Sequence, residues 1–193
     1  MATANQLVKI VSYLTGERHN RVNALAREMI NSGLIPISVG RDIKQVPPAS
    51  AALLLFAVAF ASRAADAATV AKKMRSIPCT TDPGKRLGDV VAGVLSGKLA
   101  ASQIDLHRDS TGHYSATVQL GESRMHFSAK NGRGYWQTTH SMNRMGLAQL
   151  QYILGRSDLP EDIAFAGIKT MAADGDEFTN GDQPGCDCGS KGD

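Results

Sequence analysis

The feature that most constrains the fold is an unbroken apolar run at residues 49–61 (ASAALLLFAVAFA), between Pro47-Pro48 and Ser62-Arg63. A helix needs about 20 apolar residues to cross the hydrocarbon core of a bilayer, so this run is too short to span a membrane. A helix that is apolar on every side must instead be surrounded by other protein elements. We therefore predict a buried helix at 49–61, either in the core of the protein or in a self-association surface.

The composition is compatible with such a core. The chain has 193 residues, of which 42% are apolar and 20% charged, as in globular proteins. Its three cysteines cannot form a disulfide framework, because Cys186 and Cys188 are too close together to join distant segments and only Cys79 remains. No basic stretch followed by an apolar one begins the sequence. We expect a cytoplasmic protein without a membrane segment.

Two amphipathic helices are predicted ahead of the apolar run. Apolar residues with helical spacing extend from Leu7 to Leu14, where Thr15-Gly16 interrupts them. A second set spans about 18–32, and Gly33 is placed to end that helix in the left-handed conformation. The short extended run at 34–39 then predicts a small hairpin or wing.

The pattern changes after the Thr-, Asp- and Pro-rich segment 78–84, which we interpret as a domain boundary. Before it, an Ala-rich helix is predicted at 64–74, and after it another helix at 86–95. Apolar and polar residues alternate along 113–120, as in a half-buried strand, and the alternation returns near Met125 and again at 135–139. Ser141 is placed to cap a final helix.

These elements predict an α+β protein in three parts. Residues 1–80 form a helical, helix-turn-helix-like domain, and residues 85–155 form a small antiparallel sheet with a packed helix. Residues 156–193 contain short apolar pieces around 163–168 and then Gly, Asp, Asn and Ser with few core-forming residues, which predicts an acidic, mostly disordered tail, at least beyond Ala172.

Charge is distributed unevenly over these parts. The formal net charge is +3, made up of +6 over residues 1–80, +3 over 81–155 and −6 over 156–193. A basic surface favours polyanions, because lysine and arginine release the counterions condensed on phosphates. Ordinary surface charge is the alternative interpretation. If the basic part binds DNA, the acidic tail is expected to compete for the same lysines and arginines.

The N-terminal helices carry the one motif with functional content. A helix that ends in Leu14-Thr15-Gly16, a second helix with Arg27, the exit Gly33-Leu34-Ile35-Pro36 and a loop with Arg41 resemble the winged helix-turn-helix of the mercury-resistance-regulator (MerR) and excisionase type. Phage small terminase subunits use a related module. The resemblance implies that the second helix enters the major groove, with Arg27 as the helix arginine and Arg41 as the wing arginine. Glu28-Met29 stands where the family has two aromatic residues.

The residues themselves support the same interpretation. If the apolar residues of 18–32 face the core, the polar ones lie largely off that face, near the start of the helix. Asparagine pairs bidentately with adenine and arginine with guanine, and wing cations contact phosphates. The alternative is that these arginines are solvated and bind nothing. The candidate DNA contacts are Arg18, Arg21, Asn23, Arg27, Arg41 and Lys44.

Catalytic and metal sites find little support. Four histidines fall in the sheet region, but their spacing is not that of metal ligands. Two thiols at Cys186-Asp187-Cys188 do not complete a four-ligand site, and Gly132-Arg133-Gly134 lacks the context of a phosphate loop. We therefore predict no catalytic residue, no metal and no cofactor. The four histidines are His107, His113, His126 and His140.

Three functions follow from this pattern. The first is a cytoplasmic, double-stranded-DNA-binding protein of bacterial or phage type, acting as a transcriptional regulator and forming a homo-oligomer. The second is a packaging adaptor similar to the phage small terminase, in which the apolar helix assembles a ring. The third is a protein-interaction or inhibitor protein that does not bind DNA.

Overall fold

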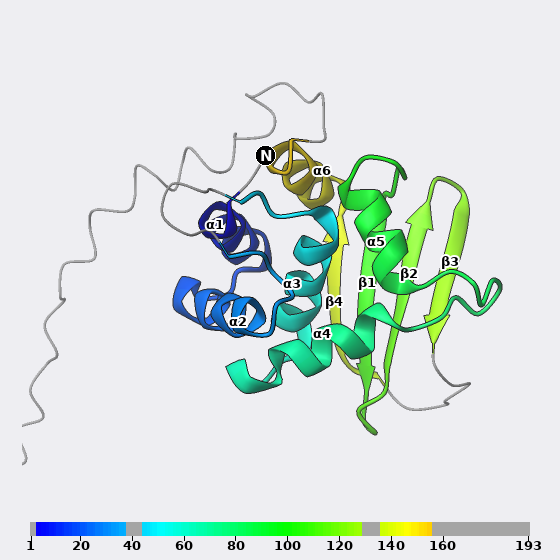
Figure 1. The fold of residues 1–193 in the computed structure, drawn as a ribbon. Coiled ribbons are helices and arrows are strands. Elements are labelled where there is room, and N and C mark those ends of the chain that lie inside the picture. The colour runs from blue at the N-terminus through cyan, green and yellow to red at the C-terminus, as the bar shows by residue number, and fades with distance from the viewer. Residues whose placement is uncertain (1–2, 38–43, 129–135, 156–193) are drawn as a thin grey trace, which may run out of the picture.

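The computed structural model describes residues 3–37, 44–128 and 136–155. In this part of the chain, the helices gather on one face of a four-stranded antiparallel sheet (Figure 1). The architecture is α+β, as the sequence predicts. The predicted acidic tail, the central part of the predicted wing, Arg41, Cys186 and Cys188 lie outside the described residues.

Helices α1 (Ala4–Thr15) and α2 (His19–Asn31) pack against one another. A capping box begins α1, in which the Thr3 hydroxyl accepts from the Gln6 N–H and the Gln6 side chain accepts from the Thr3 N–H. After α2, Gly33 takes a left-handed φ of 70° and the Leu34 N–H donates to the Met29 carbonyl at 2.8 Å. Both predicted helices and the glycine that ends the second are confirmed.

Helix α3 (Pro48–Phe60) is the predicted apolar helix. Every residue from Ser50 to Val58 is buried. The helix packs against α2 on one side and against α4 (Ala67–Arg75) and α5 (Leu87–Leu95) on the other. The short 3-10 helix η1 (Ala64–Asp66) leads into α4. The apolar run is therefore enclosed by its own chain.

The sheet consists of β1 (Gln103–Asp109), β2 (Tyr114–Leu120), β3 (Ser123–Ser128) and β4 (Trp136–Asn143). Its order β3-β2-β1-β4, antiparallel throughout, is that of a Greek key. Strand β1 is not predicted from the sequence, because Ile104 and Leu106 are the only buried apolar residues among its seven and the rest are polar or charged. This strand nevertheless lies inside the sheet, between β2 and β4.

The two faces of the sheet differ in chemistry. Ile104 pairs with Val118, and Leu106 pairs with Ala116, whose other neighbour is Phe127. These buried residues belong to the hydrophobic core that the sheet shares with the helices. The alternate positions form the outer face, which carries polar side chains: Gln103, Asp105, His107, Ser115, Thr117, Gln119, Arg124, His126, Thr139, Ser141 and Asn143.

One boundary in the sheet region was predicted incorrectly. Strand β4 continues through Ser141, and α6 (Arg144–Ile153) is capped by Asn143, whose side-chain oxygen accepts from the Gly146 N–H at 3.0 Å. Ser141 therefore does not cap this helix. Asparagine caps a helix through the same bond as serine, and the strand pairing continues as far as Asn143, opposite Gln103, so the helix begins only after that residue.

A single hydrophobic core joins the helices to the sheet. It extends from Leu7 in α1 to Leu150 in α6. The segment predicted as a domain boundary also touches the sheet, because Cys79 bridges Phe127 and the Thr80 N–H donates to the His126 carbonyl at 2.8 Å. In the described part of the chain, no helix has the length and apolar character needed to cross a membrane.

Candidate nucleic-acid interface

Two hydroxyl groups shape the turn between α1 and α2. The Thr15 hydroxyl donates to the Val11 carbonyl at 2.7 Å and accepts from the Glu17 N–H at 3.4 Å. The Ser12 hydroxyl donates to the Glu17 carbonyl at 2.6 Å. Gly16 takes a left-handed φ of 67°, which L-residues with a Cβ rarely adopt. These contacts fix the direction in which α2 leaves the turn.

The side chain of Arg21 contacts other parts of this chain. Its guanidinium donates to the Ala61 carbonyl, at the end of α3, at 2.7 Å and forms an ion pair with Glu17. Both contacts hold α2 against its neighbours. The guanidinium of Arg21 is therefore engaged with this chain, and we interpret Arg21 as a positioning residue.

The other predicted residues of α2 are more accessible. Arg18 and Arg27 are exposed, and Asn23 is half-buried. Lys44 is also exposed, in the segment that leads to α3, while Arg41 lies outside the described residues. The structure therefore places four of the six candidates, Arg21 among them, on α2 and at its start, and a fifth, Lys44, beyond the end of that helix.

The exposed face of α2 contains further polar residues that the sequence analysis did not single out. Asn20 and Asn31 are exposed there together with Ala24, at helical spacing from Arg27. The one acidic residue of α2, Glu28, is half-buried. The exposed positions of this helix are thus basic, neutral or amide-bearing.

Positive charge is concentrated in the helices and not in the sheet. We call residues 3–37 and 44–100 the helical region, and residues 101–128 and 136–155 the sheet region. The helical region has twelve lysines and arginines against five acidic residues, whereas the sheet region has three of each. A polyanion would accordingly be attracted to the helical side of the molecule.

A second basic surface lies where α4 ends and α5 begins. The sequence predicts the two helices but does not link the basic end of the first to Arg86, because the turn that brings the two together cannot be predicted from helical spacing. The surface is a shallow cleft of about 450 Å³, here named the α4–α5 cleft, lined by Lys72, Arg75, Ser76, Arg86 and Asp89.

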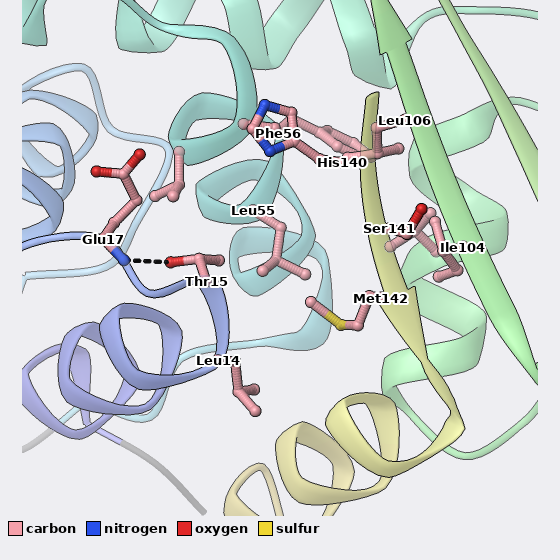
Figure 2. Close-up of a pocket in the computed structure, with 13 residues that line it drawn as sticks. Leu14, Thr15, Glu17, Leu55, Phe56, Ile104, Leu106, His140, Ser141 and Met142 are labelled. Atoms are coloured by element: carbon pink, nitrogen blue, oxygen red, sulfur yellow. Dashed lines mark hydrogen bonds between the residues drawn. The ribbon is translucent and has the colours of Figure 1, made fainter. Parts of the chain in front are cut away.

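An apolar cavity of about 150 Å³ lies between α1, α3 and the β1–β4 edge of the sheet (Figure 2). Leu14, Leu55 and Met142 face one another across it, and Thr15 and Glu17 also line it. A dry cavity of this size holds a molecule about as large as benzene. Its lining is mainly apolar, with polar residues at Thr15, Glu17, His140 and Ser141.

The outer face of the sheet carries two of the histidines of the sheet region, His107 and His126. Burial lowers the pKa of His107 below its ordinary value, an effect larger than the opposing influence of Asp105, and His126 adds to the lowering. His107 contacts the Thr139 hydroxyl at 3.0 Å, and His126 contacts that of Thr117 at 3.2 Å. Among the described residues, no three His, Cys, Asp or Glu side chains are grouped so that they could hold a metal ion.

Two further polar groups stabilise loops. The Thr111 hydroxyl donates to Asp109 at 2.7 Å and, with the N–H groups of His113 and Thr111, lowers the pKa of that carboxyl despite its burial. Burial raises the pKa of the Cys79 thiol, but hydrogen bonds from Thr81 and Asp82 hold it below its ordinary value. Cys79 is 1% exposed, which keeps external reactants from its sulfur.

Comparison of the chain with protein-family models, with curated proteins and with solved structures finds no match.

Proposed function

We propose that this protein binds double-stranded DNA through its helical region, with α2 in the major groove. The observation that carries the proposal is the surface of α2 and its start, where Arg18 and Arg27 are exposed, Asn23 is half-buried and no exposed acidic residue lies between them. Arginine and asparagine are the side chains that read guanine and adenine at base edges. We further propose that the DNA-bound protein acts as a transcriptional regulator in the cytoplasm.

Each candidate residue receives a separate role. Arg27 and Asn23 read bases, Arg18 and Lys44 contact phosphates, and Arg21 orients α2 through the Ala61 carbonyl and Glu17. The position of Arg21 explains how a helix that carries the base contacts is held in one orientation. This division of roles predicts different effects for substitutions that lie on the same helix.

The packaging-adaptor alternative receives less support. It requires the apolar helix to assemble a ring, but α3 is enclosed by α2, α4 and α5 of the same chain. A helix whose apolar residues are already buried has little apolar surface left for self-association.

The test is a fluorescence-anisotropy titration of the full chain against random and genomic duplexes at two salt concentrations. Arg27→Ala is expected to weaken binding to a preferred site by roughly 1 to 3 kcal/mol and to relax sequence preference, because a base contact is lost. Arg18→Ala is expected to weaken binding to all sequences equally. Arg144→Ala, at an exposed arginine on α6, is the matched control and should bind as the unaltered protein does.

Two outcomes would overturn the proposal. One is the absence of any salt-dependent binding to duplex DNA by the full chain. The other is an unchanged isotherm when Arg18, Asn23 and Arg27 are all replaced by alanine in a protein that retains its circular dichroism spectrum.

A further inference from the structure

The α4–α5 cleft is a basic surface separate from the exposed face of α2. Three cationic side chains, those of Lys72, Arg75 and Arg86, line it against one carboxylate, that of Asp89. Lys72 and Arg75 come from the last turns of α4, and Arg86 stands immediately before α5. Segments separated by ten residues of sequence are thus brought together to form one positively charged hollow.

A glycine allows the close approach that forms this cleft. A Cβ placed on Gly88 would lie 2.4 Å from the Cγ and 3.1 Å from the Cα of Arg75, so the end of α4 rests directly on the first turn of α5. The Arg86 guanidinium donates to the Ser76 carbonyl at 3.2 Å and ties the two helix ends together. The spacing of the three cations is therefore set by backbone packing and not by flexible side chains alone.

The charge balance of the cleft favours an anion. Asp89 in the first turn of α5 supplies its one carboxylate, and the Leu87 N–H of the same turn donates to the Ile77 carbonyl at 2.9 Å. The three cationic side chains, and not the end of the helix, therefore give the cleft a positive potential. The hollow of about 450 Å³ is shallow and open to solvent, so a phosphate chain that runs along the surface can reach its cations.

We propose that the α4–α5 cleft binds the phosphodiester backbone of the same DNA duplex that α2 contacts. The inference rests on the proposed DNA binding and adds a second contact to it. Helix α4 packs against both α2 and α5, as Figure 1 also shows. Packed helices lie about 8–10 Å apart, which puts the cleft roughly 20 Å from α2. One turn of duplex is about 34 Å long, so a single duplex can reach both surfaces.

The two surfaces then differ in what they contribute. Phosphate contacts fix the orientation of the protein on the duplex and supply affinity that depends on salt, whereas base contacts supply sequence preference. The cleft should therefore control the affinity for every sequence, and α2 the differences between sequences.

The experiment compares two triple variants of the full chain in duplex-binding titrations across a salt series. In the cleft variant, Lys72→Gln, Arg75→Gln and Arg86→Gln remove three cations. The control variant removes three exposed cations elsewhere, through Lys98→Gln, Arg124→Gln and Arg144→Gln. Both variants change the net charge equally, so nonspecific attraction alone would affect them equally.

The cleft variant is expected to lose on the order of fivefold to tenfold in affinity per lost contact at about 0.1 M salt. The slope of log K against log salt should fall by about two to three, with sequence preference retained. In the control variant, the affinity and the salt slope should both change by only a small fraction of the changes seen in the cleft variant. Arg86→Lys keeps the charge and should restore most of the affinity that Arg86→Gln removes.

The results separate failure of this inference from failure of the proposed function. If the unaltered protein binds duplex DNA and the cleft variant keeps its salt slope, the inference is overturned and the proposed function stands. Equal losses in the two variants overturn it as well. If the unaltered protein does not bind DNA, both are overturned. Should the triple variant melt at a lower temperature, Arg75→Gln alone is expected to lower the slope by about one.

Discussion

The helical region and the sheet region share one core but have different surfaces. The helical region has seven more cations than acidic groups, whereas the sheet region has equal numbers of each. The sheet buries Val118 and Phe127 on the face toward the helices and exposes polar side chains on the other. Packing therefore joins the two regions through one core, whereas the residues proposed to bind DNA lie in the helical region alone.

The largest expected effect tests whether the two regions are one folding unit. Leu54 in α3 is fully buried, so Leu54→Ala should lower the free energy of unfolding by about 2–5 kcal/mol. Because the core is continuous, the helical circular dichroism signal and the fluorescence of Trp136 on β4 should shift to lower denaturant together. Met145→Ala, at a side chain that is 53% exposed, is the control and should change stability by less than about 0.5 kcal/mol.

Two separate transitions would contradict this expectation. A shift in the helical signal with no shift in tryptophan fluorescence would mean that residues 1–80 and 85–155 fold independently, as the sequence analysis predicts.

A smaller effect is expected where α4 meets α5. Gly88→Ala forces a Cβ against the Arg75 backbone and should destabilise the protein by about 1–3 kcal/mol in chemical denaturation. Gly93→Ala, on the same helix, is the matched control, since the nearest atoms to its Cβ belong to the Leu99 side chain, at 2.9 and 3.3 Å, and not to backbone. If both substitutions cost the same, backbone packing at Gly88 does not define the cleft.

A substitution that fills the cavity between the helices and the sheet is expected to increase stability. Ala59 lines the cavity, and Ala59→Leu should fill part of the space and raise the free energy of unfolding by about 1 kcal/mol. Ala57 on the same helix is fully buried, and Ala57→Leu should destabilise the protein through overpacking. A loss of stability in Ala59→Leu would show that the cavity cannot accept the added methyl groups.

The smallest effect concerns the sheet region and its dependence on pH. The Thr111 hydroxyl and nearby N–H groups hold the pKa of Asp109 below its unfolded value, so ionised Asp109 stabilises the fold above about pH 4. This contribution is lost as the pH falls through the folded pKa. Thr111→Ala should therefore make the decrease in melting temperature between about pH 5 and about pH 3 shallower.

Ser110→Ala provides the comparison, because Ser110 is an exposed neighbour of Asp109 in the same hairpin. Its melting curves should match those of the unaltered protein at every pH. If Thr111→Ala also leaves the pH dependence unchanged, the hydroxyl does not control the ionisation of Asp109.

Local periodicity by itself determined much of the fold. The apolar run at 49–61 predicts α3, the spacing around Leu25 predicts α2, and the alternation at 113–120 predicts β2. In each case neighbouring residues repeat with the geometry of the element, so a short segment contains the whole signal. The class α+β and the exposed positions of Arg18 and Arg27 follow from the same patterns.

Only the tertiary structure decided the features that depend on distant partners. Strand β1 has few apolar residues and is stabilised by pairing with β2 and β4. Arg21 and Arg27 are arginines on the same helix, and the sequence does not distinguish them. In the structure, the guanidinium of Arg21 donates to the carbonyl of Ala61, forty residues away. The α4–α5 cleft likewise forms because Gly88 has no Cβ and so lets Arg75 pack against the first turn of α5. Such contacts join segments with no shared period, so no local pattern of residues predicts them.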